Sequence, residues 1–110
     1  MDFHNRLYNL KKQSFFNNLV IERGIEKESL RVNKDGFISN QSHPKSLGSS
    51  LTNPSITTDF AEALIEIVTP VYTDINQLYK KLESLHVFIN KNLENGEILW
   101  PYSMPPKINN

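Results

Sequence analysis

The run from Ile25 to Val32, followed by Lys34-Asp35-Gly36, constrains the fold more than any other part of the sequence. An Asp-Gly pair between two short apolar runs is a strong signal for a β-hairpin, because glycine accepts the positive φ angle of a tight turn. The pattern therefore predicts that Ile25–Val32 is a β-strand and that the chain turns back through Asp35-Gly36 into Phe37-Ile38-Ser39.

The predicted strand places two carboxylates on one face. Side chains alternate between the faces of a strand, so Glu26 and Glu28 share a face with Leu30 and Val32. The two carboxylates are then about 7 Å apart at a rise of ~3.3–3.4 Å per residue. The nearest cations are an odd number of residues away and point to the other face: Arg23, Lys27 and Arg31.

Unpaired carboxylates are costly to bury, and a divalent cation would compensate their charge. Hard oxygen ligands suit Mg²⁺, so Glu26 and Glu28 are candidate metal ligands. The alternative is a strand whose first residues are simply hydrated and whose last residues enter the core.

The stretch from Ser55 to Pro70 has an ambiguous period. Asp59 and Glu62 have the spacing of a capping box, which indicates a helix. A series of β-branched residues favours a strand instead: Ile65, Ile67, Val68 and Thr69. We favour a buried strand over Glu62–Thr69. Glu66 would then be a single carboxylate in an apolar run, which is seldom left unpaired, and Asp59 could reach the same site from the preceding loop.

The remaining elements are simpler to predict. Residues 2–12 indicate a helix with Asp2 as N-cap and with Phe3, Leu7 and Leu10 as core or packing residues. Asp74–Leu93 indicates a second helix that begins with a capping box of Asp74 and Gln77. It has one apolar stripe: Ile75, Leu78, Leu82, Leu85 and Ile89. Residues 40–53 form a predicted loop in which His43 is expected to be solvated. Leu99–Pro106 is expected to be an extended, irregular segment.

Length and composition exclude several classes of function. A chain of 110 residues forms one small domain at most. The formal net charge is zero, which argues against binding to nucleic acid or to a membrane surface through bulk charge. The sequence has no cysteine, which excludes disulfides and thiol chemistry within it. No apolar stretch approaches the ~20 residues of a membrane span, and no secretory signal is evident, so we expect a cytoplasmic protein.

Four blocks of sequence resemble the bacterial glutamate–cysteine ligases, also called γ-glutamylcysteine synthetases. The blocks occur in the family's order between about residues 20 and 106: Gly24-Ile25-Glu26-Lys27-Glu28-Ser29-Leu30-Arg31-Val32-Asn33, His43-Pro44-Lys45-Ser46-Leu47-Gly48-Ser49-Ser50-Leu51-Thr52, Ile56-Thr57-Thr58-Asp59-Phe60-Ala61-Glu62-Ala63-Leu64-Ile65-Glu66 and Leu99-Trp100-Pro101-Tyr102-Ser103-Met104-Pro105. Each block is short, and the match becomes specific because all four occur in order.

The resemblance implies an α+β fold in which an antiparallel β-sheet forms a funnel backed by helices. It also implies that ATP phosphorylates the γ-carboxylate of L-glutamate, and that the amino group of L-cysteine attacks the acyl phosphate, with Mg²⁺ bridging the phosphates. Position by position, the family's metal-binding carboxylates match Glu26, Glu28, Asp59 and Glu66. Phe60 matches a wall of the family's cysteine pocket. No catalytic acid, base or nucleophile is assigned within this chain.

Two departures from the family limit what the resemblance implies. Pro106 follows Ser-Met-Pro where the family often has cysteine, and the family's chains are several times longer than this one. Residues 1–110 are therefore expected to be the N-terminal part of a single catalytic domain, with an incomplete sheet and no activity of their own. The alternatives are a related carboxylate–amine ligase with another amine substrate, and a truncated product without catalytic function.

Overall fold

The computed structural model describes residues 2–108; Met1 and residues 109–110, which belong to the expected domain, lie outside the described residues. In chain order the helices and strands are α1 (Phe3–Lys12), the 3₁₀ helix η1 (Phe15–Asn18), β1 (Glu26–Val32), the 3₁₀ helix η2 (Lys45–Leu47), β2 (Ile56–Thr58), β3 (Leu64–Val68), α2 (Ile75–Asn92) and β4 (Ile98–Leu99). The predicted helices over 2–12 and 74–93 are confirmed, and their N-caps are Asp2 and Asp74 as expected.

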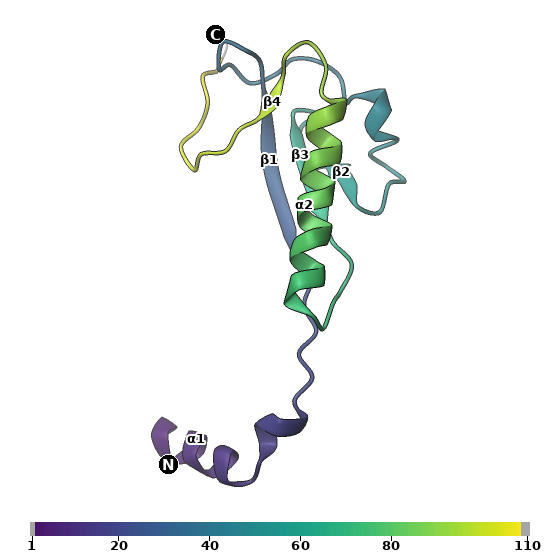
Figure 1. Cartoon of the computed structure of the whole chain (residues 1–110). Coiled ribbons are helices and arrows are strands. Elements are labelled where there is room, and N and C mark those ends of the chain that lie inside the picture. The colour runs from purple at the N-terminus through teal and green to yellow at the C-terminus, as the bar shows by residue number, and fades with distance from the viewer. Residues whose placement is uncertain (1, 109–110) are drawn as a thin grey trace.

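The four strands form one open antiparallel sheet in the order β2-β3-β1-β4 (Figure 1). The expected α+β class with an incomplete antiparallel sheet is therefore confirmed. The predicted strands over 25–32 and 62–69 correspond to β1 and β3, and β3 is shorter than expected. The helical alternative for this stretch is wrong, because Asp59 and Glu62 lie in the turn that joins β2 to β3.

The turn at Asp35-Gly36 is confirmed, but the hairpin that it makes is very short. Gly36 has a φ of 82°, and the Asn33 amide donates to the Phe37 carbonyl oxygen at 2.9 Å. The returning segment pairs with β1 only through a bridge between Val32 and Ile38. The reason is that β3 already pairs with the same edge of β1 up to Leu30.

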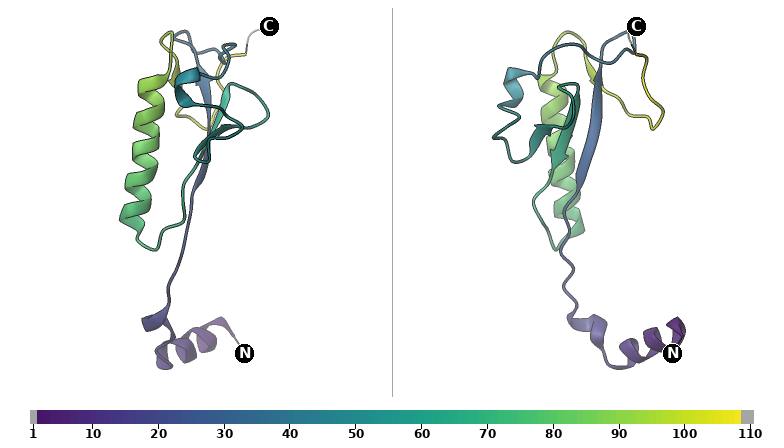
Figure 2. Two further views of the ribbon diagram at one scale, coloured as in Figure 1. Left: turned by 90° about the vertical axis from the view of Figure 1, so that its right-hand side faces the viewer. Right: turned by 180° about the vertical axis from the view of Figure 1, so that it is seen from behind.

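Helix α2 covers one face of the sheet, and only loops lie on the other side within residues 2–108 (Figure 2). The buried cluster between α2 and the sheet consists of Leu47, Ile56, Ile65, Ile67, Leu85 and Ile89. Leu78 is also buried, as the apolar stripe predicted. Ile75 is a correction, because it stands in the first turn of the helix, beyond the sheet, and is 54% exposed.

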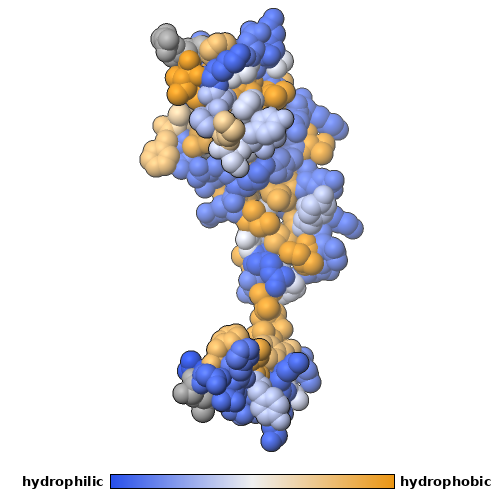
Figure 3. All heavy atoms as spheres, turned by 90° about the vertical axis from the view of Figure 1, so that its left-hand side faces the viewer, coloured by the Kyte–Doolittle hydropathy of each residue, from blue (hydrophilic) through white to orange (hydrophobic). Residues whose placement is uncertain are grey.

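The N-terminal arm, residues 2–21, extends away from the sheet (Figure 1). No described residue of α1 is buried, and Phe3 is 71% exposed, so the prediction that its apolar side chains pack in a core is wrong for this chain. The end of the arm that connects it to the sheet is apolar and exposed (Figure 3), and consists of Leu19, Val20 and Ile21. Among the described residues, no helix combines the length and the apolar character that crossing a membrane requires.

Candidate metal centre

Three of the four candidate ligands lie on the sheet face opposite α2, which we call the carboxylate face (Glu26, Glu28, Leu30, Leu64, Glu66 and Val68 of β1 and β3). Its orientation follows from β3, where Ile65 and Ile67 are fully buried toward α2 and Glu66 between them must point the other way. Glu28 pairs directly with Glu66 across the two antiparallel strands. Directly opposite residues have Cβ atoms about 4.5–5.5 Å apart, so these two carboxylates are close neighbours.

Asp59 reaches the same region from the Asp59–Ala63 turn between β2 and β3. The Asp59 amide donates to the Leu64 carbonyl oxygen at 3.1 Å, which closes the turn. The Asp59 carboxylate accepts the Phe60 amide through Oδ1 at 3.0 Å. The turn therefore holds Asp59 just outside the end of the strand that carries Glu66.

The carboxylates influence one another electrostatically. Desolvation raises the pKa of the Glu66 carboxyl above its ordinary value, and the negative charges of Asp59, Glu26 and Glu28 raise it further. Within residues 2–108, none of these four side chains has an ion-pair partner, because the single ion pair found there joins Arg31 to Glu97. The site therefore carries concentrated negative charge without a protein cation to balance it.

The donor set fits a hard divalent cation, because all four ligands are carboxylate oxygens. The fit is incomplete in one respect: within residues 2–108, no three His, Cys, Asp or Glu side chains lie close enough together to hold a metal ion. The four residues Glu26, Glu28, Asp59 and Glu66 are thus neighbours, but their carboxylate groups do not yet form a coordination sphere. Full coordination would need side-chain rotation, water or phosphate oxygens, or ligands from outside this chain.

A cavity of about 350 Å³ adjoins the carboxylate face beside Glu28. Its other wall is the segment from Trp100 to Pro106, which is irregular, as expected, and bends after β4. The Trp100 Nε1–H donates to the Met104 carbonyl oxygen at 2.6 Å, and the Trp100 and Tyr102 rings meet edge to face at 5.1 Å. These contacts give the segment a fixed shape next to the candidate metal ligands.

Phe60, the candidate wall of a substrate pocket, follows Asp59 in the turn. Its side chain is 99% exposed, and its φ of 45° is unusual for a residue other than glycine. A fully exposed aromatic ring offers a large apolar area to a ligand or to another part of a protein.

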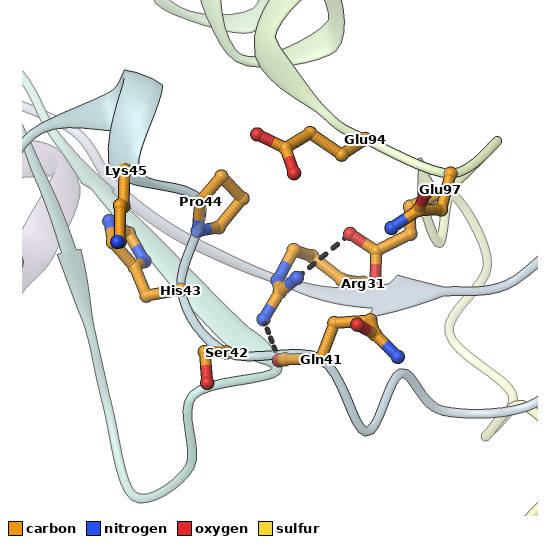
Figure 4. A pocket seen from close by; sticks show the side chains of 9 residues that line it. Arg31, Gln41, Ser42, His43, Pro44, Lys45, Glu94 and Glu97 are labelled. Carbon is orange, nitrogen blue, oxygen red and sulfur yellow. Dashed lines mark hydrogen bonds and ion pairs between the residues drawn. The ribbon is translucent and has the colours of Figure 1, made fainter.

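Sequence reasoning missed a buried ion pair behind the carboxylate face. Arg31 of β1 is completely buried and its Nη1 donates to Glu97 Oε2 at 2.8 Å (Figure 4). A local signal existed, because alternation places Arg31 on the face that packs under α2, where a cation needs a partner. The partner is 66 residues away in sequence, so no local pattern could identify it.

His43 was also assigned wrongly as a solvated loop histidine. It lines a cavity of about 370 Å³ with Arg31, Gln41 and Glu97, and Figure 4 shows it beside Pro44 and Lys45. Both ring nitrogens of His43 are buried without a hydrogen-bond partner in the part of the chain that the structure describes. Burial lowers the pKa of His43, and the positive charge of Arg31 lowers it further.

Residues 5–110 match the glutamate–cysteine ligase family. The chain belongs to this family. It is 53% identical over 85 residues to the glutamate–cysteine ligase of Hahella chejuensis and 54% identical over 88 residues to that of Wigglesworthia glossinidia brevipalpis. These matches cover 77% and 80% of the chain but only 16% and 17% of the two relatives.

Solved structures of similar proteins share the fold. The glutamate–cysteine ligase of Francisella tularensis in complex with AMP aligns with a TM-score of 0.76 and 41% identity, covering 80% of this chain and 18% of that one. A bifunctional glutathione synthetase from Pasteurella multocida aligns with a TM-score of 0.73 and 37% identity, covering 76% and 12%. The chain therefore spans about one sixth of the length of the glutamate–cysteine ligases that it matches.

Proposed function

We propose that this chain is the N-terminal part of the catalytic domain of an ATP-dependent glutamate–cysteine ligase. The enzyme would join the γ-carboxyl group of L-glutamate to the amino group of L-cysteine through an acyl phosphate, the first step of glutathione biosynthesis. The observation that carries the proposal is the proximity of Glu26, Glu28, Asp59 and Glu66, which have no ion-pair partner within residues 2–108, in a chain of this family.

In this proposal the four carboxylates hold Mg²⁺. When bound, Mg²⁺ would neutralise the phosphate charge that builds up during phosphoryl transfer. In this proposal the chain serves to position the ligands. Strands β1 and β3 fix Glu26, Glu28 and Glu66 on one face of the sheet, and the turn before β3 fixes Asp59. No group of this chain is assigned a proton-transfer or nucleophilic step.

The proposed substrates are ATP, L-glutamate and L-cysteine. AMP in the Francisella tularensis relative supports nucleotide binding by proteins of this fold. The cavity beside Glu28 and the exposed ring of Phe60 give the carboxylate face room for further substrate groups. We also propose a cytoplasmic enzyme that binds neither nucleic acid nor membranes, in keeping with the zero formal net charge.

A second candidate is a carboxylate–amine ligase that uses another amine. The same test applies to it, because Phe60, the one proposed element of the amine pocket, is 99% exposed in the described structure. The amine specificity would then depend on residues outside this chain.

The test uses the full-length protein that contains this segment. Purified enzyme is supplied with ATP, Mg²⁺ and L-glutamate together with L-cysteine, other amino acids or no amine, and ADP and dipeptide formation are measured. Product with cysteine at the highest kcat/KM supports the proposal. Preference for another amine would support the second candidate, and the absence of any ATP-dependent ligation would reject both.

A further inference from the structure

Within residues 2–108, Arg31 is the one residue outside β3 and the turn itself that donates hydrogen bonds to the turn carrying Asp59 and Phe60. The Arg31 backbone amide donates to the Ala63 carbonyl oxygen at 2.7 Å. Its side chain, which lies on the opposite face of β1 from Glu28, donates from Nη2 to the Glu62 carbonyl oxygen at 2.9 Å. Two successive carbonyl groups of the turn are thus bound by one residue of β1.

Arg31 is itself fixed in place. Its Nη1 binds Glu97 at 2.8 Å, and its Nη2 also donates to the Gln41 carbonyl oxygen at 2.7 Å. Glu97, which precedes β4, accepts a further hydrogen bond from the Ser39 hydroxyl group. The guanidinium therefore links four segments that are distant in sequence, and it cannot rotate without breaking a buried ion pair (Figure 4).

The turn needs such a restraint more than an ordinary turn does. Phe60 holds a left-handed backbone conformation with a φ of 45°, which costs free energy for a residue with a bulky side chain. Asp59 is bound to the Phe60 amide through its own carboxylate, so the direction of that carboxylate depends on the shape of the turn. Whatever fixes the turn therefore fixes Asp59 relative to Glu66.

The fork geometry of the guanidinium is what makes these contacts simultaneous. A guanidinium presents several N–H donors in one plane, whereas a lysine ammonium is a compact charge on a flexible stem. The cluster is also not optimised for stability alone, because the Arg31 Nε is buried without a hydrogen-bond partner in the described part of the chain. Its two Nη groups are directed at Glu97 and at the loop carbonyl groups instead.

We propose that the Arg31–Glu97 pair is a positioning device for the candidate metal centre. The pair holds the Asp59–Ala63 turn so that Asp59 stays beside Glu28 and Glu66, where rotation of the side chains would let them share a cation. The proposal rests on the proposed function of these carboxylates. Arg31 and Glu97 touch neither the cation nor the substrates and act only through the turn. Groups outside the ligand shell that orient metal ligands typically change metal affinity by about 10–100-fold when they are removed.

The experiment uses the full-length protein and Mn²⁺ as a probe of the cation site, measured by electron paramagnetic resonance. The double variant Arg31→Met/Glu97→Leu removes both buried charges together, so the fold can survive while the Glu62 carbonyl loses its donor. We expect its thermal transition to stay near that of the wild type, its Mn²⁺ affinity to fall by about tenfold or more and its KM for Mg²⁺–ATP to rise.

Two further variants sharpen the test. Arg31→Lys keeps the charge beside Glu97 but cannot span Glu97 and both carbonyl groups, so Mn²⁺ binding should weaken in the same direction even if the double variant does not fold. Glu94→Gln is the matched control, because Glu94 lines the same cavity and its carboxylate makes no hydrogen bond or ion pair in the described structure. It should bind Mn²⁺ as the wild type does.

The outcomes separate this inference from the proposed function. If the wild type binds Mn²⁺ and ligates glutamate to cysteine while the folded Arg31 variants bind Mn²⁺ equally well, the positioning role is overturned and the enzyme assignment stands. If the wild type itself neither binds Mn²⁺ nor forms product, the proposed function fails and the positioning role fails with it.

Discussion

Glu28 of β1 and Glu66 of β3 lie directly opposite each other on the same face of the sheet. Like charges in this relationship destabilise an antiparallel pair of strands. Neither side chain has an ion-pair partner within residues 2–108, and desolvation, followed by the charges of the neighbouring acids, raises the pKa of Glu66. The strands therefore carry a repulsion that a bound cation would relieve, which links the stability of the sheet to the proposed metal.

The first prediction concerns the pH dependence of this repulsion. The folded-state pKa of Glu66 is raised above its ordinary value, so ionised Glu66 lowers the free energy of unfolding at neutral pH. As the pH falls through the raised pKa, the folded chain takes up a proton before the unfolded chain does, and the penalty disappears. In the metal-free 110-residue chain, Glu66→Gln should therefore unfold at a higher temperature than the wild type at pH 7, and the difference should vanish by about pH 4.

Circular dichroism during heating measures this effect. Glu83→Gln, on the exposed surface of α2, is the matched control and should leave the transition unchanged at both pH values. A Glu66→Gln chain that melts at or below the wild-type temperature at pH 7 would contradict the repulsion.

The second prediction concerns Glu26 in the full-length protein. Glu26→Gln keeps the size of the side chain but removes the charge that would bind Mg²⁺. We expect kcat to fall by orders of magnitude while the circular dichroism spectrum is unchanged. Steady-state kinetics with varied Mg²⁺ provide the measurement, with Glu83→Gln again as control. Normal turnover in the Gln variant would remove Glu26 from the metal centre.

The third prediction compares two helix caps. The Asp74 carboxylate accepts hydrogen bonds from the backbone N–H groups of Asn76 and Gln77 at 2.7 and 3.4 Å. Asp2 caps α1 in the same way, by accepting a hydrogen bond from the backbone N–H of Asn5 at 2.9 Å. Asp74→Ala should lower the free energy of unfolding by about 1 kcal/mol, because α2 packs on the sheet.

Asp2→Ala should leave that same transition unchanged, because no described residue of α1 is buried. Urea titration of the 110-residue chain distinguishes the two caps. An equal loss in both variants would show that the arm docks on the body.

The fourth prediction concerns the buried ion pair. Arg31→Met alone leaves Glu97 buried without its cation, with only 3% of the Glu97 side chain exposed, and should destabilise the chain by about 3–5 kcal/mol. Adding Glu97→Leu should restore most of that loss, because it removes the one buried charge that Arg31→Met leaves uncompensated. Denaturant titrations of the two variants form the measurement. A double variant as unstable as the single one would mean that the hydrogen bonds to the loop carbonyl groups, and not the charge, dominate.

The fifth prediction is that the isolated 110 residues form no γ-glutamylcysteine from ATP, glutamate and cysteine. The chain spans about one sixth of its relatives, and on the carboxylate face it offers only loops as cover within residues 2–108. An assay of the purified chain at high concentration tests this. Product that depends on both ATP and cysteine would refute it.

Several elements of the fold followed directly from the sequence. Alternation placed Glu26 and Glu28 on one face of β1, and the apolar stripe with its Asp74 cap identified α2. The series of β-branched residues identified β3 correctly against the capping-box alternative. These features are local, because they depend on backbone periodicity and on contacts between residues a few positions apart.

Other features could not be predicted in this way. The Phe37–Ser39 segment looked like the second strand of a hairpin, yet β3 occupies that edge of β1. The apolar side chains of α1 looked like core residues, yet the arm finds no surface on the body within the described structure. In both cases the sequence specified what a segment can form, and competition between distant segments decided what it pairs with.

By itself, then, the sequence determined which acidic residues are candidate metal ligands, and on which face of its strand each of Glu26 and Glu28 lies. Only the tertiary structure decided that Glu28 lies opposite Glu66, that the turn brings Asp59 beside them, and that Arg31 and Glu97 meet behind that turn. The physical reason is that strand periodicity is fixed by the geometry of neighbouring peptide units. Strand register and buried ion pairs depend instead on the free energy of bringing together segments that are up to 66 residues apart.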